Sequence, residues 1–253
     1  RLTQACQRKC KECQIPSSFN GRKLFFNKQT VYSFTPNTLS CEFLSLEEIK
    51  LFLNFLKKKY PDILRITNIS SRTPREFIKI SRILQRYGAQ VLELNTKYTI
   101  RYKDSRNGNE KYILNFLKEI NINKEMDLPL ILKVYPDLLK KRFLKDVSRY
   151  VYGLTITDSK SGILPSHFKN KMSKDIKKKT CAIVGEPLWE LVKKYVPIAK
   201  CYVNFVSASG GIYNVQRAKE IMKLGADSVQ LCSGIEFFSY NFISQTVKEI
   251  ESV

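Results

Sequence analysis

The sequence predicts an α/β fold, and the architecture that fits best is a (β/α)8 TIM barrel with an irregular first quarter. Short apolar runs alternate with amphipathic stretches from Ile63 onward, which favours a parallel sheet wrapped by helices. Cap and turn residues separate these runs: Thr73 and Pro74 precede one helical stretch and Gly88 follows it. Near the other end, an apolar strand runs into a Gly-Gly pair and then a helix, the type of strand-end loop in which such barrels bind ligands. An open doubly wound sheet is the alternative fold.

The elements follow in order from the apolar periodicity. The N-terminal part has two short apolar runs and then a helix, "SLEEIKLFLNFLKKK", and we expect these to supply the first part of the barrel. Strands are expected at 23–26, 30–34, 63–69, 90–95, 129–136, 153–159, 201–208 and 228–234. Helices are expected at 45–59, 73–88, 110–122, 137–151, 187–196, 214–225 and 242–253. We divide the chain into a cysteine-containing N-terminal segment with short strands (1–44) and a β/α barrel (45–253).

Composition limits the class of protein. The 253 residues are 43% hydrophobic, and 44 Lys and Arg against 23 Asp and Glu give a net charge of +21. Such a charge attracts polyanions, so nucleic acid is a possible partner; a generally lysine-rich surface is the plainer explanation. No apolar run approaches the roughly 20 residues that span a bilayer. Seven cysteines without a visible secretion signal indicate a reducing compartment, and we expect a cytoplasmic protein without membrane contact.

The Gly-Gly pair predicts a phosphate site. Gly210 and Gly211 leave their backbone N–H groups accessible, and the helix that starts near Asn214 adds the positive end of its dipole. One βα unit later, "CSG" ends the next strand and adds the groups of Cys232, Ser233 and Gly234. A plain tight turn is the alternative for either corner alone. Two corners at this spacing favour a phosphate.

Five segments in order resemble the dihydroorotate dehydrogenase superfamily of FMN-binding TIM barrels, which includes the flavin domain of dihydropyrimidine dehydrogenase. They are "VLELN", "LILKVYPDL", "GLTITDS", "VGEPLWELV" and "SASGGIYNVQRAKEIMKLGADSVQLCSG", and the resemblance covers about residues 63–240. It implies a flavin-binding barrel and an FMN-dependent oxidoreductase. The implied reaction is hydride transfer between the flavin and a pyrimidine-like or other unsaturated small molecule.

The resemblance also implies roles for individual residues. Lys133, inside a strand, is expected to reach the flavin ring or the substrate, because a buried cation needs a compensating partner. The alternative is that its stem packs while its amine reaches solvent. Asn95 is expected to hold substrate or flavin, and Gly185 to pass close to the ring or the ribityl chain. The full FMN-binding set is Lys133, Asp158, Gly185, Ser209, Gly210, Gly211, Cys232, Ser233 and Gly234.

Two positions depart from the family pattern. Tyr98 stands where the family has a Ser or Cys that exchanges a proton with the pyrimidine, and Asp158 stands where it has an Asn. A phenol can donate a proton but is a poor base near neutral pH. We therefore name Lys133, Asn95 and Tyr98 as catalytic candidates. We keep as the alternative a tRNA dihydrouridine synthase-like enzyme or a catalytically degenerate, basic RNA-binding barrel.

The N-terminal cysteines form a separate motif. Cys6, Cys10 and Cys13 have the spacing C-x3-C-x2-C, and Cys41 can supply a fourth ligand. This favours an iron–sulfur cluster, with zinc or unliganded thiols as alternatives. It is also the spacing of radical S-adenosylmethionine enzymes, our second alternative. A cluster beside a flavin would be an electron path out of the barrel to a partner. We also expect a homo-oligomer or a hetero-complex. His167, the single histidine, lies in a polar loop and is interpreted as a surface residue.

Overall fold

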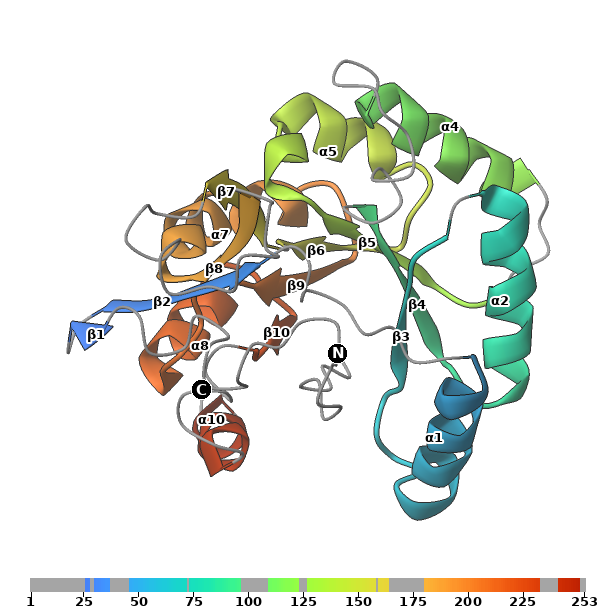
Figure 1. The fold of residues 1–253 in the computed structure, drawn as a ribbon, viewed down its shortest axis with the longest axis horizontal. Helices are drawn as coiled ribbons and strands as arrows, with labels where there is room; N and C mark the ends of the chain where they lie inside the picture. Colours follow the sequence, from blue (N-terminus) through green and yellow to red (C-terminus); the bar gives the residue numbers. More distant parts are fainter. Residues whose placement is uncertain are drawn as a thin grey trace, which may run out of the picture.

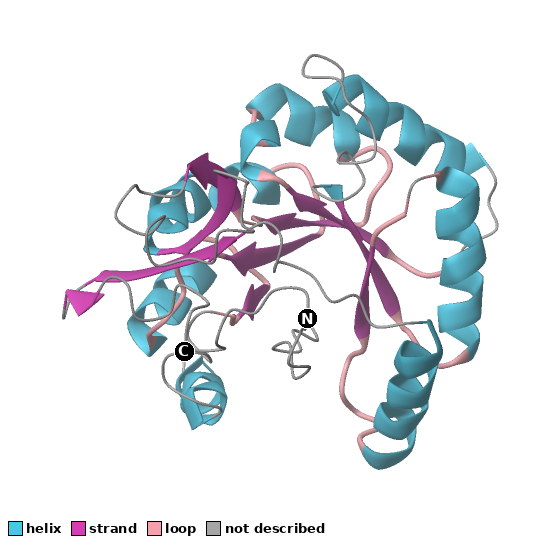
Figure 2. Cartoon of the chain, viewed as in Figure 1, coloured by secondary structure: helices cyan, strands magenta, loops and turns pink. Residues whose placement is uncertain are grey.

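The computed structural model describes residues 26–27, 30–36, 46–71, 73–96, 109–122, 127–157, 159–163, 180–232 and 241–250, and side chains are described from residue 46 onward except at 161–163 and 180–182. These residues form an α/β fold, as predicted. Parallel strands and helices alternate along the chain, and the helices lie on the outer side of a curled sheet (Figure 1, Figure 2).

The main sheet has six parallel strands in the order β10-β9-β6-β5-β4-β3. Its strands are β3 (Ile66–Ile69), β4 (Val91–Asn95), β5 (Leu130–Val134), β6 (Gly153–Ile156), β9 (Phe205–Ser209) and β10 (Ser228–Gln230). The sheet curls as half of a barrel does, with β3 and β10 at its two edges (Figure 1). A closed (β/α)8 barrel is therefore not confirmed within the described residues.

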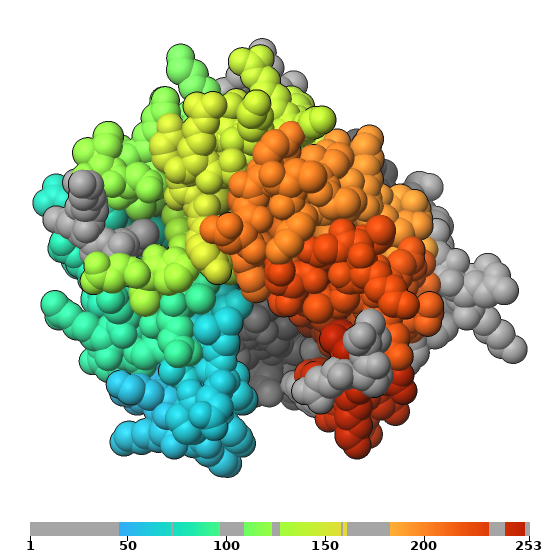
Figure 3. All heavy atoms as spheres, turned by 180° about the vertical axis from the view of Figure 1, so that it is seen from behind, coloured from blue at the N-terminus to red at the C-terminus, as the bar shows by residue number. Residues whose placement is uncertain are grey.

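Seven α-helices are described, and they follow the strands around the outside of the arc. They are α1 (Leu46–Lys59), α2 (Pro74–Arg86), α4 (Asn109–Ile122), α5 (Lys141–Val147), α7 (Trp189–Lys200), α8 (Val215–Lys223) and α10 (Asn241–Ile250), with short 3-10 turns η2 (Pro136–Leu138) and η3 (Glu186–Leu188). The view from behind shows the same order as a continuous run of colour from blue at α1 to red at α10 (Figure 3). No helix in the described part of the chain has the length and apolar character needed to cross a bilayer.

The core lies between the sheet and these helices. Strands β4, β5 and β6 are buried along their whole length. Leu92, Leu94 and Leu132 belong to one hydrophobic cluster with Phe77 of α2 and Phe116 of α4. The rings of Phe77 and Phe116 meet edge to face with centroids 6.2 Å apart. This packing holds the strands in fixed register, so that residues at their carboxyl ends keep fixed positions.

A second, antiparallel sheet corrects the prediction for the N-terminal strands. Its order is β1-β2-β8-β7, formed by β1 (Phe26–Asn27), β2 (Thr30–Pro36), β8 (Thr180–Gly185) and β7 (Lys160–Ile163). The two N-terminal strands therefore pair outside the parallel sheet instead of supplying barrel strands. The reason is topological: only two residues separate β1 from β2, whereas a parallel crossover needs a dozen or more. The division at 44/45 stays a prediction.

The other element boundaries differ by a few residues. The strand predicted at 201–208 begins at Phe205, because α7 continues to Lys200 and a turn follows it. As a consequence Cys201 lies exposed in that turn. The strand predicted at 228–234 is described as β10 up to Gln230.

Candidate functional site

A hollow lies where β6, β8, β9 and β10 end, at the carboxyl edge of the parallel sheet. It opens to solvent, and the space accessible within it is about 30 Å³, which is small for a ligand site. Its lining is Ser159, Val184, Gly185, Leu188, Ser209, Gly210, Gly211, Ile212, Gln230 and Cys232. Five of the residues predicted to bind FMN thus lie around one hollow: Gly185, Ser209, Gly210, Gly211 and Cys232.

The glycine corner, residues 209–212, turns the chain from β9 toward α8. Gly210 and Gly211 have φ of +117° and +74°, a region that residues with a Cβ rarely adopt. A Cβ on Gly210 would lie 2.9 Å from Leu188 Cβ, and one on Gly211 would lie 2.8 Å from Trp189 Cβ. Both glycines are therefore required by close packing against η3 and α7 as well as by the turn itself.

The glycine corner carries backbone N–H donors just before the start of α8. Within the described residues, no backbone carbonyl accepts a hydrogen bond from the N–H group of Gly210, Gly211 or Ile212. Asn214 caps α8 directly after the corner by accepting from the N–H of Arg217 at 2.8 Å. N–H groups beside a helix N-terminus suit an anion such as a phosphate.

Arg217 stabilises the glycine corner through a hydrogen bond to its backbone. It forms two 2.7 Å bonds to the Glu186 carboxylate and donates to the Gly211 carbonyl at 2.8 Å. Its guanidinium lies 4.7 Å from the Trp189 ring centroid and 4.4 Å from that of Tyr213. Burial and a hydrogen bond with Glu186 raise the pKa of Tyr213, so this phenol stays neutral at physiological pH. The cluster fixes the Gly211 carbonyl, and with it the peptide plane that follows.

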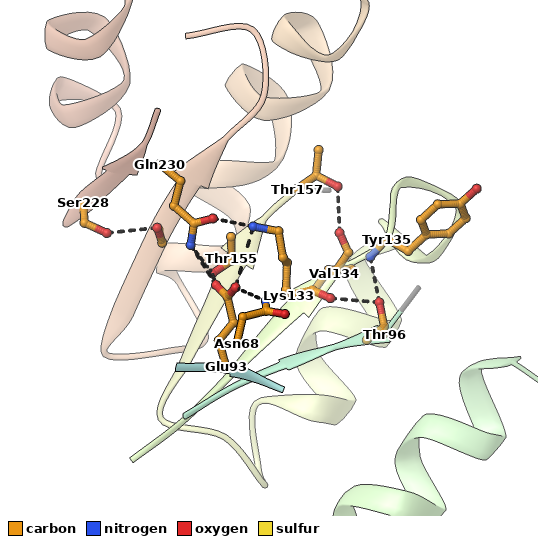
Figure 4. Close-up of polar contacts among 11 residues, drawn as sticks. Asn68, Glu93, Thr96, Lys133, Val134, Tyr135, Thr155, Thr157, Ser228 and Gln230 are labelled. Atoms are coloured by element: carbon orange, nitrogen blue, oxygen red, sulfur yellow. Dashed lines mark hydrogen bonds and ion pairs between the residues drawn. The ribbon is translucent and has the colours of Figure 1, made fainter. Parts of the chain in front are cut away.

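Lys133, the buried lysine of β5, is fully enclosed. Its side chain is 0% exposed, so the alternative that its amine reaches solvent is wrong. The ammonium donates to Gln230 Oε1 and lies 3.7 Å from Glu93 Oε1 (Figure 4). Gln230 belongs to β10 and also lines the hollow. The lysine charge therefore sits behind the hollow and is compensated inside the protein.

Glu93 of β4 is the centre of a buried network (Asn68, Glu93, Lys133, Thr155 and Gln230). Its carboxylate accepts hydrogen bonds from Asn68 at 2.5 Å, Thr155 at 2.5 Å and Gln230 at 2.7 Å. Burial alone would raise its pKa, but the Lys133 charge and these three donors outweigh burial and hold the pKa below its usual range. Glu93 is therefore ionised and forms an ion pair with Lys133.

Strand register explains why these residues meet. Asn95, Lys133, Thr155, Ser207 and Ser228 are successive partners across β4, β5, β6, β9 and β10, so five neighbouring strands carry a polar residue at one level. Glu93 lies two residues before Asn95 and therefore shares its face of the sheet. A period-two polar pattern within apolar strands, as in "ELN", was the signal for Glu93. Sequence reasoning missed Glu93, Gln230, Thr155 and Asn68.

Two threonines fix the backbone between the network and the glycine corner. Thr96 donates to the Lys133 carbonyl at 2.8 Å and accepts from the Tyr135 N–H at 2.9 Å. Thr157 donates from its hydroxyl to the Val134 carbonyl at 2.7 Å and from its N–H to the Ser209 carbonyl at 2.8 Å. The ends of β4, β5, β6 and β9 are thus tied together around the hollow.

Several predicted residues lie outside the described residues. These are Tyr98, Asp158, Ser233, Gly234 and the cysteines Cys6, Cys10, Cys13 and Cys41. Asn95 is described and lies buried at the end of β4, in register with Lys133. Among the described side chains, no group of three or more His, Cys, Asp or Glu could hold a metal ion.

Comparison with known proteins connects the fold with one group of enzymes. No protein-family profile matches the chain. The chain is similar to a dihydroorotate dehydrogenase (quinone) of Bartonella tribocorum (strain CIP 105476 / IBS 506), at 29% identity over 146 residues, 53% of this chain and 38% of the relative. A dihydroorotate dehydrogenase (quinone) of Wigglesworthia glossinidia brevipalpis is 28% identical over 131 residues, 48% of this chain and 36% of the relative. The aligned part spans little more than a third of either relative, and over that part this chain is dihydroorotate dehydrogenase-like.

Proposed function

We propose that this chain is an FMN-dependent oxidoreductase of the dihydroorotate dehydrogenase type. It would transfer hydride between the flavin and a pyrimidine-like or other unsaturated small molecule. The observation that carries the proposal is the hollow at the carboxyl ends of β9 and β10, where the glycine corner and Cys232 lie together. The similarity to two dihydroorotate dehydrogenases supports the same reaction class.

The glycine corner is suited to the phosphate of FMN. The N–H groups of Gly210, Gly211 and Ile212 have no backbone acceptor within the described residues, and α8 begins just beyond them. A phosphate would accept hydrogen bonds from these groups and interact favourably with the helix dipole. We assign Ser209, Cys232, Ser233 and Gly234 to the same phosphate site, and Gly185 to the part of the hollow nearer the ring.

The buried network is suited to the flavin ring end. When bound, FMN supplies the centre that accepts or gives up the hydride. Lys133 would place a cation next to the pyrimidine edge of the ring, and Asn95 would orient the substrate. Asp158 would lie beside the cofactor. Tyr98 would donate a proton to the substrate, because a phenol with a pKa of about 10 is protonated at neutral pH.

The partners belong to the proposal as well. We propose a small-molecule substrate and an electron-transfer partner. An iron–sulfur cluster on Cys6, Cys10, Cys13 and Cys41, or zinc in its place, would connect the flavin with that partner. Assembly as a homo-oligomer or a hetero-complex would bring the two centres together.

A flavin titration tests the proposed function. FMN is added to apo-protein, and bound cofactor is measured by its visible absorbance and by the quenching of its fluorescence. We expect a yellow complex with one FMN per chain. Protein that takes up no FMN, but binds RNA with strong salt dependence, would overturn the proposal and favour the basic RNA-binding barrel, for which the net charge of +21 is the argument.

A further inference from the structure

We propose that Glu93 is a positioning residue for the redox site. By pairing with Lys133 it lowers the net positive charge behind the hollow, and Gln230, which bonds to both residues, connects this pair with the hollow. The inference rests on the proposed function, because the group that would sense the charge is bound FMN. It adds to that function a residue that controls the redox balance of the site from below the hollow.

Gln230 connects the ion pair with the hollow. Its Oε1 accepts from the Lys133 ammonium, and its Nε2 donates to Glu93 Oε2 at 2.7 Å. It is the member of the buried network that also lines the hollow. Figure 4 shows the Gln230 amide between Lys133 and Glu93, with its oxygen bonded to the ammonium and its nitrogen bonded to the carboxylate. The side chain therefore has one orientation in which all of these bonds are made.

Glu93 is held as a carboxylate from several directions. Asn68 on one neighbouring strand and Thr155 on the next strand but one each donate to it at 2.5 Å, and Lys133 lies 3.7 Å away. The donors come from strands in fixed register, so neither the charge nor the place of Glu93 depends on a ligand. Lys133 is consequently half of an ion pair, separated from the hollow by Gln230.

The pairing has an electrostatic consequence. A lone buried cation would favour the reduced cofactor strongly, because reduction adds electrons to the ring. An ion pair has no net charge, and its field falls off faster with distance than that of a single charge. Glu93 therefore reduces the preference of the site for reduced FMN. A purely structural ion pair distant from the cofactor would leave that preference unchanged.

The test is the reduction potential of bound FMN, measured anaerobically against reference dyes. For Glu93→Gln we expect the ratio of oxidised to reduced FMN dissociation constants to rise about tenfold, a potential about 30 mV more positive for two electrons. Lys133→Met removes the cation, so we expect a shift in the opposite direction. Glu249→Gln is the matched control: it removes a carboxylate paired with Lys219 between α8 and α10, and should leave the potential unchanged.

Gln230→Glu makes the test independent of whether Glu93→Gln folds. It places a second negative charge beside Lys133 at a partly exposed position, so we expect a more negative potential. Wild-type protein that binds FMN, together with variants that leave the potential unchanged or shift it all in one direction, would overturn the inference. Wild-type protein that binds no FMN would overturn the proposed function itself, which is a different result.

Discussion

The buried network and the glycine corner border the same hollow but are built in opposite ways. In the network, side chains from five strands satisfy one another: Glu93 accepts three hydrogen bonds and pairs with Lys133. In the corner, the polar groups are backbone N–H groups without a backbone acceptor in the described residues. This difference indicates that the two regions control different properties of the protein. The corner should determine how tightly an anion binds, and the network should determine stability, pH response and redox preference.

Removal of the Glu93 charge is expected to have the largest effect. Glu93→Gln leaves Lys133 buried without its counter-charge, and loss of one partner of a buried pair costs about 3–5 kcal/mol. Urea unfolding followed by circular dichroism measures the free energy of unfolding. Glu249→Gln, at an exposed pair, should unfold like the wild type. Equal midpoints for the two variants would show that the Lys133 charge is compensated by some other group.

Lys133→Met tests the same pair through its pH dependence. Because the folded-state pKa of Glu93 is lowered, its ionisation stabilises the fold above the usual glutamate pKa, and this contribution is lost as pH falls through the lowered value. Without Lys133, burial would dominate and raise that pKa. We expect the variant to be less stable by about 3 kcal/mol at neutral pH, because three donors to Glu93 remain.

The difference between this variant and the wild type should shrink on acidification. It begins to shrink as pH falls through the raised Glu93 pKa of the variant, and it shrinks further below the usual glutamate pKa, as the wild type loses its own contribution. Urea unfolding at several pH values from neutral to acidic measures it. A difference that stays constant across this range would show that Glu93 is not the group that Lys133 stabilises.

The contrast also explains what sequence reasoning found. The burial of Lys133 followed from a lysine within "LILKV", and the glycine corner followed from local pattern. Glu93 and Gln230 are 137 residues apart and meet only because β10 and β4 curl toward each other, which no local pattern encodes. The antiparallel sheet was missed for the same reason: β2 pairs with β8, which lies about 150 positions further along the chain. In the sequence, Arg217 looks like an ordinary exposed cation of a helix. Its contacts with Glu186 and Trp189 arise only from the tertiary fold.

Gly211→Ala tests the corner. A left-handed φ costs an alanine about 1–2 kcal/mol, and its Cβ would lie 2.8 Å from Trp189 Cβ. We expect the free energy of unfolding to fall by about 2 kcal/mol. The dissociation constant for FMN should rise at least tenfold, because the backbone N–H groups of residues 210–212 would move. Fluorescence titration with FMN measures the second effect.

Gly225→Ala is the matched control for that substitution. Gly225 also has a positive φ, of +103°, but its Cβ would meet Lys200, away from the hollow. This variant should lose stability and keep its affinity for FMN. If both alanine variants weaken FMN binding equally, the loss reflects global destabilisation, and the corner has no special role in holding the phosphate.

The smallest expected effect separates the α8 N-terminus from an ordinary helix start. Asn214 caps α8 beside the hollow, and Thr73 caps α2, where its hydroxyl accepts from the Glu76 N–H at 3.2 Å. Replacement of either cap by alanine should cost about 1 kcal/mol of stability. Only Asn214→Ala should also weaken FMN binding, by a few-fold, because α8 begins directly after the glycine corner, where we propose that the phosphate binds. Isothermal titration with FMN on both variants measures this difference. Equal affinities would mean that the N–H groups of residues 210–212 bind the phosphate without help from the helix dipole.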